Sequence, residues 1–448
     1  MTASNLARMP VVVMGLGRFG GGIGVTRWLV QQGARVTVTD QADAEALAGS
    51  VAQLTDLPVT FHLGGHDPRD LEDCRLLVVS PAVAKERSPF VQAAIARGIP
   101  LSSEMNLFVE RCPARRVVGI TGTAGKSTTT AMIGAILEAA HTAGAGPRVW
   151  VGGNIGQSLL ADLDDMQADD IVVLELSSFQ LEDLGVLRWS PSHAVITNIQ
   201  PNHLDRHGTL GAYRDAKLNI VRFQRPADLV FVNERDRELI GHVAGVGGAE
   251  RLRTFAFEQA WRNGLQVPGR HNEDNAAAAI AVVRSLDVAD AHIRQGLAGF
   301  RGLPHRLEFV ASRRGVRYYN DSKSTTPGSA HLALESFDGP VVMLIGGRDK
   351  GMSFEALARL LARRAKGVVC YGETGLNLYE EIRRHGAGGS SAEVHLAGPL
   401  EEAVGKAASL AAAGDVVVLS PACTSYDQFA NYEQRGETFS RLVRDLPD

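Results

Sequence analysis

A lysine and a run of hydroxyl side chains follow a glycine-bearing turn in residues 117–130, VVGITGTAGKSTTT. The segment predicts a short apolar strand, a turn and the start of a helix. Glycines let backbone N–H groups approach phosphate oxygens, and the N-terminus of a helix favours anions. Lys126 would reach the β- and γ-phosphates of a nucleoside triphosphate, and the Ser127 hydroxyl would ligate Mg²⁺.

This turn departs from the general phosphate-loop pattern. The pattern has glycine five residues before Gly125, where this chain has Ile120. Gly119 and Gly122 bracket that position instead. The alternatives are a shortened phosphate loop and an ordinary strand–turn–helix corner, and the Lys-Ser-Thr run favours the loop.

A second glycine-rich turn, Gly15–Gly20, follows the first apolar run of the chain, and Asp40 ends the next run. Three interpretations fit this arrangement. One is a dinucleotide-binding turn, and another is close strand–helix packing without a ligand. The third is a nucleotide-sugar diphosphate bound at the helix N-terminus, with Asp40 on a ribose or uracil group.

Carboxylate and imidazole groups follow two further apolar runs. Glu175 ends the run IVVLE and is well placed to hold Mg²⁺ or a water on it, while Ser177 or Ser178 could cap the next helix. His203 lies in a short polar loop with other ionisable side chains, which favours a site over an isolated surface histidine. From its helical context alone, Lys217 is expected on a solvated helix face.

The last third of the chain has further polar groups at strand ends. Asp321, Lys323 and Thr325 combine a carboxylate, an amine and a hydroxyl, which suits an anionic or zwitterionic substrate. The turn Gly346–Gly351 offers a second anion-binding loop. Cys423 has no identifiable base nearby, so a small buried residue is expected there rather than a nucleophile.

Two asparagines precede an alanine-rich helical pattern. Asn272 and Asn275 suit either capping of that helix or recognition of an adenine edge. The residues alone leave both alternatives open.

Short apolar runs alternate with amphipathic stretches through most of the chain, which predicts an α/β protein with parallel sheets covered on both faces. The expected strands are 10–14, 35–39, 76–80, 117–121, 171–176, 194–198, 229–233, 341–345, 367–371 and 416–419. The clearest helical patterns are 24–32, 126–140, 210–223, 273–286, 354–364 and 400–413. A linker-like segment at 111–116 and a new block that starts near 303–305 divide the chain into predicted domains at 1–113, 114–302 and 303–448.

The length of 448 residues suits several domains, and the net charge of −4 gives no reason to expect a nucleic acid or an anionic membrane as partner. Four cysteines lie far apart without C-x-x-C spacing, which argues against a zinc site and disulfides and predicts a reducing cytoplasm. No apolar run approaches the length of a membrane span, and the N-terminus lacks a signal-peptide pattern.

Nine segments in this order resemble the Mur ligase family over nearly the whole chain. They are GTAGKST (122–128), GGNIG (152–156), ELSSFQLE (175–182), NHLDRHGT (202–209), GRHNEDN (269–275), LPHR (303–306), NDSKST (320–325), GGRDKG (346–351) and SPACTSYDQF (420–429). NDSKST and SPACTSYDQF resemble the branch that adds D-glutamate, and the DNPR motif of a sister branch is absent.

The resemblance implies a three-domain fold. Its parts would be a Rossmann-like N-terminal domain for the UDP part of a nucleotide sugar, a central phosphate-loop ATPase domain with a parallel-rich sheet, and a Rossmann-like C-terminal domain for the amino acid. The implied activity is ATP-dependent amide formation between UDP-N-acetylmuramoyl-L-alanine and D-glutamate through an acyl phosphate. The implied enzyme is a cytoplasmic monomer of peptidoglycan precursor synthesis.

The resemblance also implies residue roles, including carbamylation of Lys217, which replaces the solvated-face expectation. The implied catalytic residues are Lys126, Glu175, His203 and Lys217. The implied ligands of two Mg²⁺ ions are Ser127, Glu175, His203 and the carbamate of Lys217. ATP would contact Thr123, Ala124, Gly125, Lys126, Ser127, Thr128, Thr129, Asn275, Arg306 and Asp321. The other substrates would contact Gly17, Arg18, Phe19, Asp40, Asn154, His203, Lys323, Thr325, Lys350, Ser425 and Tyr432.

Several positions depart from the family pattern. Ala124 and Asn202 stand where Asn and Asp are usual, which removes polar or charged groups near ATP and metal. Arg18-Phe19 and Ala82 differ around the UDP pocket, and Tyr432 stands where Phe is common.

Three other functions fit part of these residues. A sister ligase adding another amino acid shares most of these motifs. A non-catalytic ATP-binding regulator would fit Ala124 and Asn202. A nicotinamide-dependent oxidoreductase would use Gly15–Gly20 and Asp40, but it leaves Lys126 and Glu175 unexplained.

Overall fold

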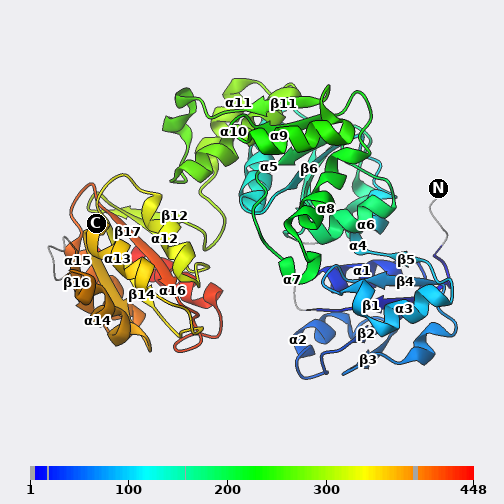
Figure 1. Ribbon diagram of the computed structural model, residues 1–448, viewed down its shortest axis with the longest axis horizontal. Coiled ribbons are helices and arrows are strands. Elements are labelled where there is room, and N and C mark those ends of the chain that lie inside the picture. The colour runs from blue at the N-terminus through cyan, green and yellow to red at the C-terminus, as the bar shows by residue number, and fades with distance from the viewer. Residues whose placement is uncertain (1–5, 18–19, 157, 387–391) are drawn as a thin grey trace. The chain divides into compact units, whose positions relative to one another are not determined.

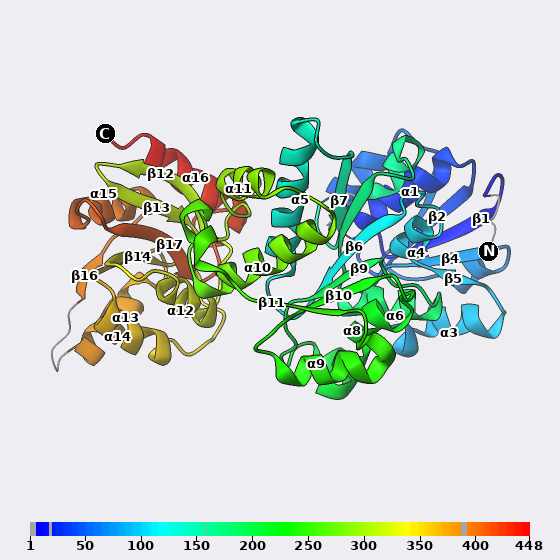
Figure 2. The ribbon, with the colours of Figure 1, turned by 90° about the horizontal axis from the view of Figure 1, so that it is seen from above.

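The computed structural model describes residues 6–17, 20–156, 158–386 and 392–448, and it contains three sheets, each covered by helices (Figures 1 and 2). By internal contacts the chain divides into two units, Met1–Phe257 with Asn275–Gly296 and Glu258–Asp274 with Leu297–Asp448. The chain therefore passes between the units three times. The first unit holds two sheets and the second holds the third.

The first sheet has five parallel strands in the order β3-β2-β1-β4-β5. Its elements are β1 Pro10–Met14, α1 Gly21–Gln31, β2 Arg35–Asp40, α2 Ala48–Val51, β3 Val59–Leu63, β4 Leu76–Val79, α3 Pro89–Ala96, β5 Leu101–Ser102 and α4 Glu104–Val109. Alternate residues of β1 face opposite layers. Val11 and Val13 pack in the cluster that includes α1, while Val12 and Met14 pack in the cluster that includes α3.

The second sheet has six parallel strands in the order β11-β10-β9-β6-β8-β7. Its elements are β6 Arg116–Thr121, α5 Lys126–Thr142, β7 Val149–Gly153, β8 Ile171–Glu175, α6 Ser178–Val186, β9 His193–Ile196, α7 Leu204–His207, α8 Leu210–Arg222, β10 Leu229–Asn233, α9 Arg237–Val243 and β11 Leu252–Phe255. The helices α10 Arg270–Ser285 and α11 Asp290–Gly299 follow.

Strand β6 lies between β8 and β9, so the loops that follow β6, β8 and β9 meet at one edge of this sheet. Those loops contain the predicted phosphate loop, the segment after Glu175 and the segment that leads to His203. The parallel order thus gathers the predicted site, as expected for the carboxyl ends of strands in an open α/β sheet.

The third sheet is mixed, with the order β12-β13-β17-β14-β15-β16. Its elements are β12 Glu308–Arg313, β13 Val316–Asn320, α12 Pro327–Glu335, β14 Val341–Gly346, α13 Glu355–Arg364, β15 Gly367–Tyr371, α14 Gly375–Gly386, β16 Glu393–Leu396, α15 Leu400–Leu410, β17 Val416–Ala422 and α16 Tyr432–Arg444. Strands β13 to β17 pair in parallel, whereas β12 is antiparallel to β13.

A two-residue turn explains the antiparallel strand. Arg314 and Gly315 join β12 to β13 and have φ angles of 50° and 75°. Positive φ at both central residues is typical of the tight turn that matches the twist of a hairpin. The sequence predicted a strand end before Asp321, where β13 ends, but it predicted neither the hairpin nor β12.

Helices cover both faces of the third sheet. The cluster on one face includes residues of α12, α13 and α14, and the cluster on the other includes residues of α15 and α16. Along β14, Val341, Met343 and Ile345 belong to the first cluster, while Val342 and Leu344 belong to the second. Burial on both faces explains why these strands appear in the sequence as unbroken apolar runs.

Every expected strand and helix is present, with shifts of a few residues at the ends. The short or partly polar strands β3, β5, β7, β11 and β16 were not expected. No helix in the described ranges is both long and apolar enough to cross a membrane.

We predict that Gly346→Ala destabilises the second unit. Gly346 has a φ of 141°, and a Cβ atom there would lie 1.9 Å from the carbonyl oxygen of Tyr371 in the neighbouring strand. The clash and the strain should lower the free energy of unfolding by about 2–4 kcal/mol, measured by urea denaturation. Gly351→Ala is the control, because Gly351 has a φ of 75° but open space around it. The control should cost only about 1 kcal/mol, and equal losses would contradict the clash.

Candidate active site

The predicted phosphate loop connects β6 to α5 and is shaped by Gly125. This residue precedes the helix with a φ of 84°. A Cβ atom at this position would lie 2.4 Å from the Oδ1 atom of Asn275, so the loop backbone and this asparagine are in direct contact. The Thr129 hydroxyl donates a hydrogen bond of 3.2 Å to the same Oδ1 atom. Asn275 therefore lies beside the loop, although 146 residues separate it from Thr129.

The capping role considered for two asparagines is wrong. Helix α10 begins at Arg270, so Asn272 and Asn275 lie inside its first turns rather than ahead of them. By contrast, Ser177 caps α6 through a reciprocal box with Gln180, as the sequence suggested.

Lys126, Ser127 and Thr128 form the first turn of α5, where backbone N–H groups have no partner within the helix. The Lys126 amine donates to the carbonyl oxygen of Thr123 at 3.0 Å, so it is folded back over the loop. Ser127 and Thr128 are half-buried. This helix start has the features that favour bound phosphate.

Lys217 lies beneath the loop and is only 1% exposed, so the expectation of a solvated helix face is wrong. Its amine donates to the carbonyl oxygen of Gly122 at 2.8 Å and to the Thr121 hydroxyl at 3.3 Å. Burial, helped by the nearby charge of Lys126 and opposed by that of Glu175, lowers the pKa of Lys217 to about 7. A substantial fraction of this amine is therefore neutral at neutral pH.

Tyr213, one helical turn before Lys217, connects several of these groups. Its hydroxyl lies 3.2 Å from the Thr123 hydroxyl, and its ring lies 4.7 Å from the Lys217 amine. The His203 ring centroid lies 6.3 Å from that of Tyr213. Tyr213 was not predicted from the sequence, although its i−4 spacing from Lys217 places both on one helix face.

Glu175 ends β8 and is 2% exposed. Its Oε1 atom accepts a hydrogen bond of 3.0 Å from the Asn154 amide, and its backbone carbonyl accepts one of 2.8 Å from the Asn154 N–H. The Oε2 atom is buried and has no hydrogen-bond partner. A buried carboxylate oxygen without a partner is costly unless a cation or water completes it.

The residues present fit a Mg²⁺ site of the kind that relies on phosphate and water for most ligands. The unpartnered Glu175 oxygen and the hydroxyl of Ser127 are both oxygen donors of the type this ion prefers. Within the described parts of the chain, no three His, Cys, Asp or Glu side chains gather as a ready-made metal cluster. These described residues therefore do not form a metal site whose ligands are all protein side chains.

His203 precedes α7 in a left-handed conformation, with a φ of 52°. Such backbone is uncommon for a residue with a side chain and is often retained at functional sites. The Phe179 ring packs edge-on to the His203 ring at 5.3 Å and stacks with the His207 ring at 5.2 Å. Aromatic contacts therefore hold this exposed histidine next to the segment that follows Glu175.

Arg206 links the His203 helix to the first domain. Its guanidinium lies 4.4 Å above the Phe179 ring and donates to the carbonyl oxygens of Ala82 and Val83 at 2.8 and 3.1 Å. The loop that contains these carbonyls follows β4. This contact could not be predicted from the sequence, because it joins positions more than 120 residues apart.

The predicted nucleotide-sugar turn is partly described. The Gly17 N–H donates to Asp40 Oδ2 at 3.2 Å, and the Ala42 N–H donates to Oδ1 at 2.9 Å. Asp40 thus holds the turn after β1. Arg18 and Phe19 lie outside the described residues.

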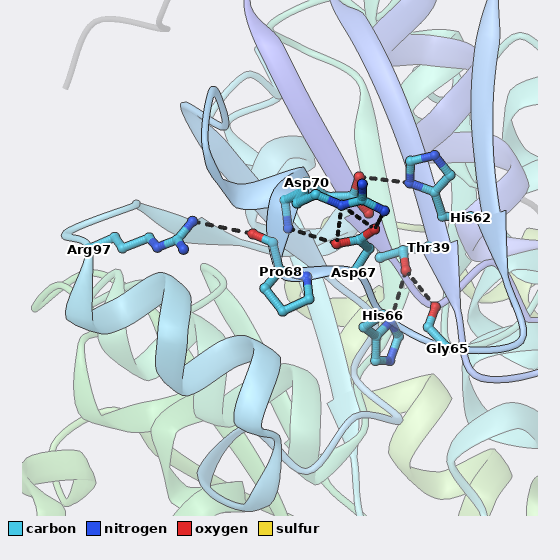
Figure 3. A network of polar contacts seen from close by, with 9 residues as sticks. Thr39, His62, Gly65, His66, Asp67, Pro68, Asp70 and Arg97 are labelled. Carbon is cyan, nitrogen blue, oxygen red and sulfur yellow. Dashed lines mark hydrogen bonds and ion pairs between the residues drawn. The ribbon is translucent and has the colours of Figure 1, made fainter.

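Thr39 forms hydrogen bonds with Gly65 and His66 of the loop that follows β3 (Figure 3). The Thr39 hydroxyl donates to the Gly65 carbonyl at 3.1 Å and lies 2.9 Å from His66 Nδ1. Because the single hydroxyl proton serves the carbonyl, His66 Nδ1–H must be the donor in the second bond. Burial lowers the pKa of His66, which favours this neutral form.

In the second unit, Lys350 donates to the Thr325 hydroxyl at 3.2 Å, and the Lys323 amine lies 5.3 Å from the Tyr432 ring. Ser425 is buried. Among the residues predicted to bind the amino acid, Lys350 thus contacts Thr325, Lys323 contacts Tyr432, and Ser425 is buried.

Asp321 is buried, and both of its oxygens already accept hydrogen bonds. Oδ1 accepts from the Leu307 N–H at 3.2 Å, and Oδ2 accepts from the Ser420 hydroxyl at 2.8 Å. Burial raises its pKa to about 6, against these hydrogen bonds and the nearby charge of Arg306. Arg306 itself is exposed.

Arg435 of α16 is fully buried and was not expected from the sequence. Its guanidinium donates to the Ser322 hydroxyl and carbonyl and to the carbonyls of Cys423 and Thr424, over 2.9–3.1 Å. It therefore ties together the two segments that contain Lys323 and Ser425. Burial raises the pKa of Cys423 to about 11, which agrees with a structural thiol.

Three family models match the chain in sequence order. They are the MurD-like N-terminal domain over residues 9–103, the Mur ligase middle domain over 120–262 and the glutamate ligase domain over 305–423. A UDP-N-acetylmuramoylalanine–D-glutamate ligase from Roseiflexus sp. (strain RS-1) is 40% identical, over 98% of this chain and 99% of that protein. The chain belongs to the Mur ligase family. A ligase of the same name from Symbiobacterium thermophilum is 37% identical to this Mur ligase, over 95% of this chain and 97% of that protein.

Solved Mur ligases share the three-domain fold. The UDP-N-acetylmuramate-alanine ligase MurC from Thermotoga maritima matches with a TM-score of 0.57 and 22% identity, over 97% of this chain and 99% of that one. The MurF ligase from Thermotoga maritima, solved in complex with ADP, matches with a TM-score of 0.53 and 18% identity, over 98% and 96%. The predicted fold class and family are confirmed, while the domain boundaries and site residues stay predictions.

We predict that the buried Lys217 amine makes stability pH-dependent. The unfolded chain keeps this proton up to about pH 10.5, whereas the folded chain releases it near pH 7. Between these values the unfolded state binds more protons, so the free energy of unfolding should rise with pH. Relative to Lys217→Met, the wild type should gain up to about 1.4 kcal/mol per pH unit in this window.

Urea unfolding in buffer depleted of carbon dioxide, at about pH 7 and about pH 9, measures this difference. Lys406→Met serves as the control, since the Lys406 amine is partly exposed and paired with Glu402. Equal pH slopes in the wild type and Lys217→Met would contradict the burial argument.

Proposed function

We propose that this chain is an ATP-dependent ligase that joins D-glutamate to UDP-N-acetylmuramoyl-L-alanine in the synthesis of peptidoglycan precursors. The observation that carries the proposal is the grouping at one sheet edge of the phosphate loop, the unpartnered Glu175 oxygen and the buried Lys217 amine. The names of the relatives that match nearly the full chain support the choice of substrates.

The reaction needs a leaving group, because a carboxylate does not react with an amine unaided in water. In the proposed sequence, the terminal carboxylate of the alanyl substrate attacks the γ-phosphorus of ATP, and ADP leaves. The amine of glutamate then attacks the acyl carbon of the resulting acyl phosphate. Phosphate leaves, the amine loses a proton, and the amide bond is formed.

Catalysis in this scheme is mainly positional and electrostatic. Lys126 and the N-terminus of α5 would hold the triphosphate, and Asn154, which contacts Glu175, would hold the muramoyl substrate. Bound Mg²⁺ would neutralise charge on the transferring phosphoryl group. The residues proposed to hold two such ions are Ser127, Glu175, His203 and a carbamate on Lys217. A neutral Lys217 amine is the form able to take up carbon dioxide, and its lowered pKa supports this step.

The remaining contacts are proposed by domain. Gly17 and Asp40 of the first domain would bind the uridine diphosphate part, with Arg18 and Phe19 in the same turn. Arg306 and Asp321 would contribute to the ATP site. Lys323, Thr325, Lys350, Ser425 and Tyr432 would bind D-glutamate. The cytoplasmic location and the monomeric state stay predictions.

Phosphate release by the full-length protein tests the proposed function. With ATP, Mg²⁺ and UDP-N-acetylmuramoyl-L-alanine present, release should be fastest with D-glutamate in a panel of D- and L-amino acids. Lys126→Ala should lower kcat/KM by about 100-fold or more, because an essential charge on the phosphates is lost.

Lys406→Ala, a lysine change on α15, should stay within about twofold of the wild type. Fastest release with L-alanine or a diamino acid would favour a sister ligase. ATP binding without substrate-dependent release would favour a regulator. Either result would overturn the proposal.

A further inference from the structure

The segment 197–200, which follows β9, lies directly against the phosphate loop. A Cβ atom on Gly122 would lie 1.9 Å from the Thr197 hydroxyl oxygen, so only glycine allows this approach. The Thr123 N–H donates to the Asn198 carbonyl at 2.9 Å. The Thr123 hydroxyl accepts from the Gln200 N–H at 2.9 Å and donates to the Gln200 carbonyl at 3.1 Å.

The Asn198 carboxamide forms hydrogen bonds with both the N–H and the carbonyl of Ala124 in the loop. Its Oδ1 atom accepts from the Ala124 N–H at 3.0 Å, and its Nδ2 atom donates to the Ala124 carbonyl at 3.0 Å. The Thr197 hydroxyl donates to the same carbonyl at 2.6 Å. Three side-chain hydrogen bonds therefore fix the peptide groups of an exposed alanine whose own side chain makes no polar contact.

Two consequences follow for the loop. The Ala124 N–H already has a partner, so it is not available to a phosphate oxygen, and the amides at the start of α5 must take that role. The Asn198 carboxamide, which makes these bonds, is also neutral. A carboxylate in its place would lose the donor to the Ala124 carbonyl and add negative charge beside the predicted triphosphate.

We propose that Asn198 is a positioning residue for ATP, which fixes the loop through Ala124 and keeps it in register with the segment that leads to His203. This rests on the proposed function, because it assigns ATP to this loop. The bonds of Asn198 also explain how the loop keeps its shape with alanine at position 124.

Asn198→Asp tests the role, because it keeps the size of the side chain and one acceptor while removing the donor. Asn219→Asp is a matched control in α8. The Asn219 amide donates to the Leu181 carbonyl at 3.0 Å, so the same type of bond is lost in the same domain away from the loop. Steady-state kinetics with the full-length enzyme would give KM for each substrate, and a fluorescent ATP analogue with Mg²⁺ would give binding without turnover.

Asn198→Asp should raise KM for ATP and weaken analogue binding by about 10- to 100-fold, since the Ala124 carbonyl loses one of its two side-chain donors and a repulsive charge is added. KM for UDP-N-acetylmuramoyl-L-alanine should change less than about threefold, and Asn219→Asp should leave KM for ATP within the same range. Thr197→Val, which removes one bond to the Ala124 carbonyl, should raise KM for ATP by about threefold to tenfold.

The result with Thr197→Val keeps the test decisive if Asn198→Asp does not fold, as judged by its thermal unfolding. Unchanged KM for ATP in the folded variants would overturn the inference, as would equal increases for both substrates. Failure of the wild type to release phosphate would instead overturn the proposed function, so the two failures are distinguishable.

Discussion

The burial of one amine beneath the phosphate loop is the constraint on which the rest of the site depends. Lys217 forms no ion pair with any described side chain, and its hydrogen bonds go to a carbonyl and a hydroxyl of the loop strand. A buried charge without a counter-ion is costly, so its environment favours the neutral amine. The position of the helix that carries Lys217 and the path of the loop above it are therefore fixed together.

The surrounding groups extend the same arrangement. Tyr213 joins the loop to the Lys217 helix, Asn154 holds one oxygen of Glu175, and Phe179 packs against His203. Each contact joins segments at or after the carboxyl ends of different strands of one parallel sheet. The sheet order supplies the proximity, and side-chain hydrogen bonds supply the precision of a few tenths of an ångström.

The sequence predicted the strands that are buried on both faces, because runs such as 341–345 and 416–419 are unbroken and apolar. It also located Lys126 and Glu175, since a glycine turn and a strand-end carboxylate are local signals. It did not reveal the hairpin at Arg314-Gly315, whose strands are partly polar, or the buried state of Lys217 from helical context alone. Asn198 and Arg206 were missed because they bond to backbone groups 74 or more residues away, which leave no trace in residue type. Arg435 was missed because most of its partners are backbone carbonyls too.

The chain crosses between its two units three times, so neither unit is one continuous stretch of sequence. Residues 275–296 belong to the first unit, although 258–274, just before them, belong to the second. A single protease cut after Phe257 would leave α10 on the C-terminal fragment, yet Asn275 would still contact Thr129, and Gly296 would still pack against Ile136. The two fragments would thus remain associated as a nicked enzyme, and neither unit can be exchanged between proteins as one continuous cassette.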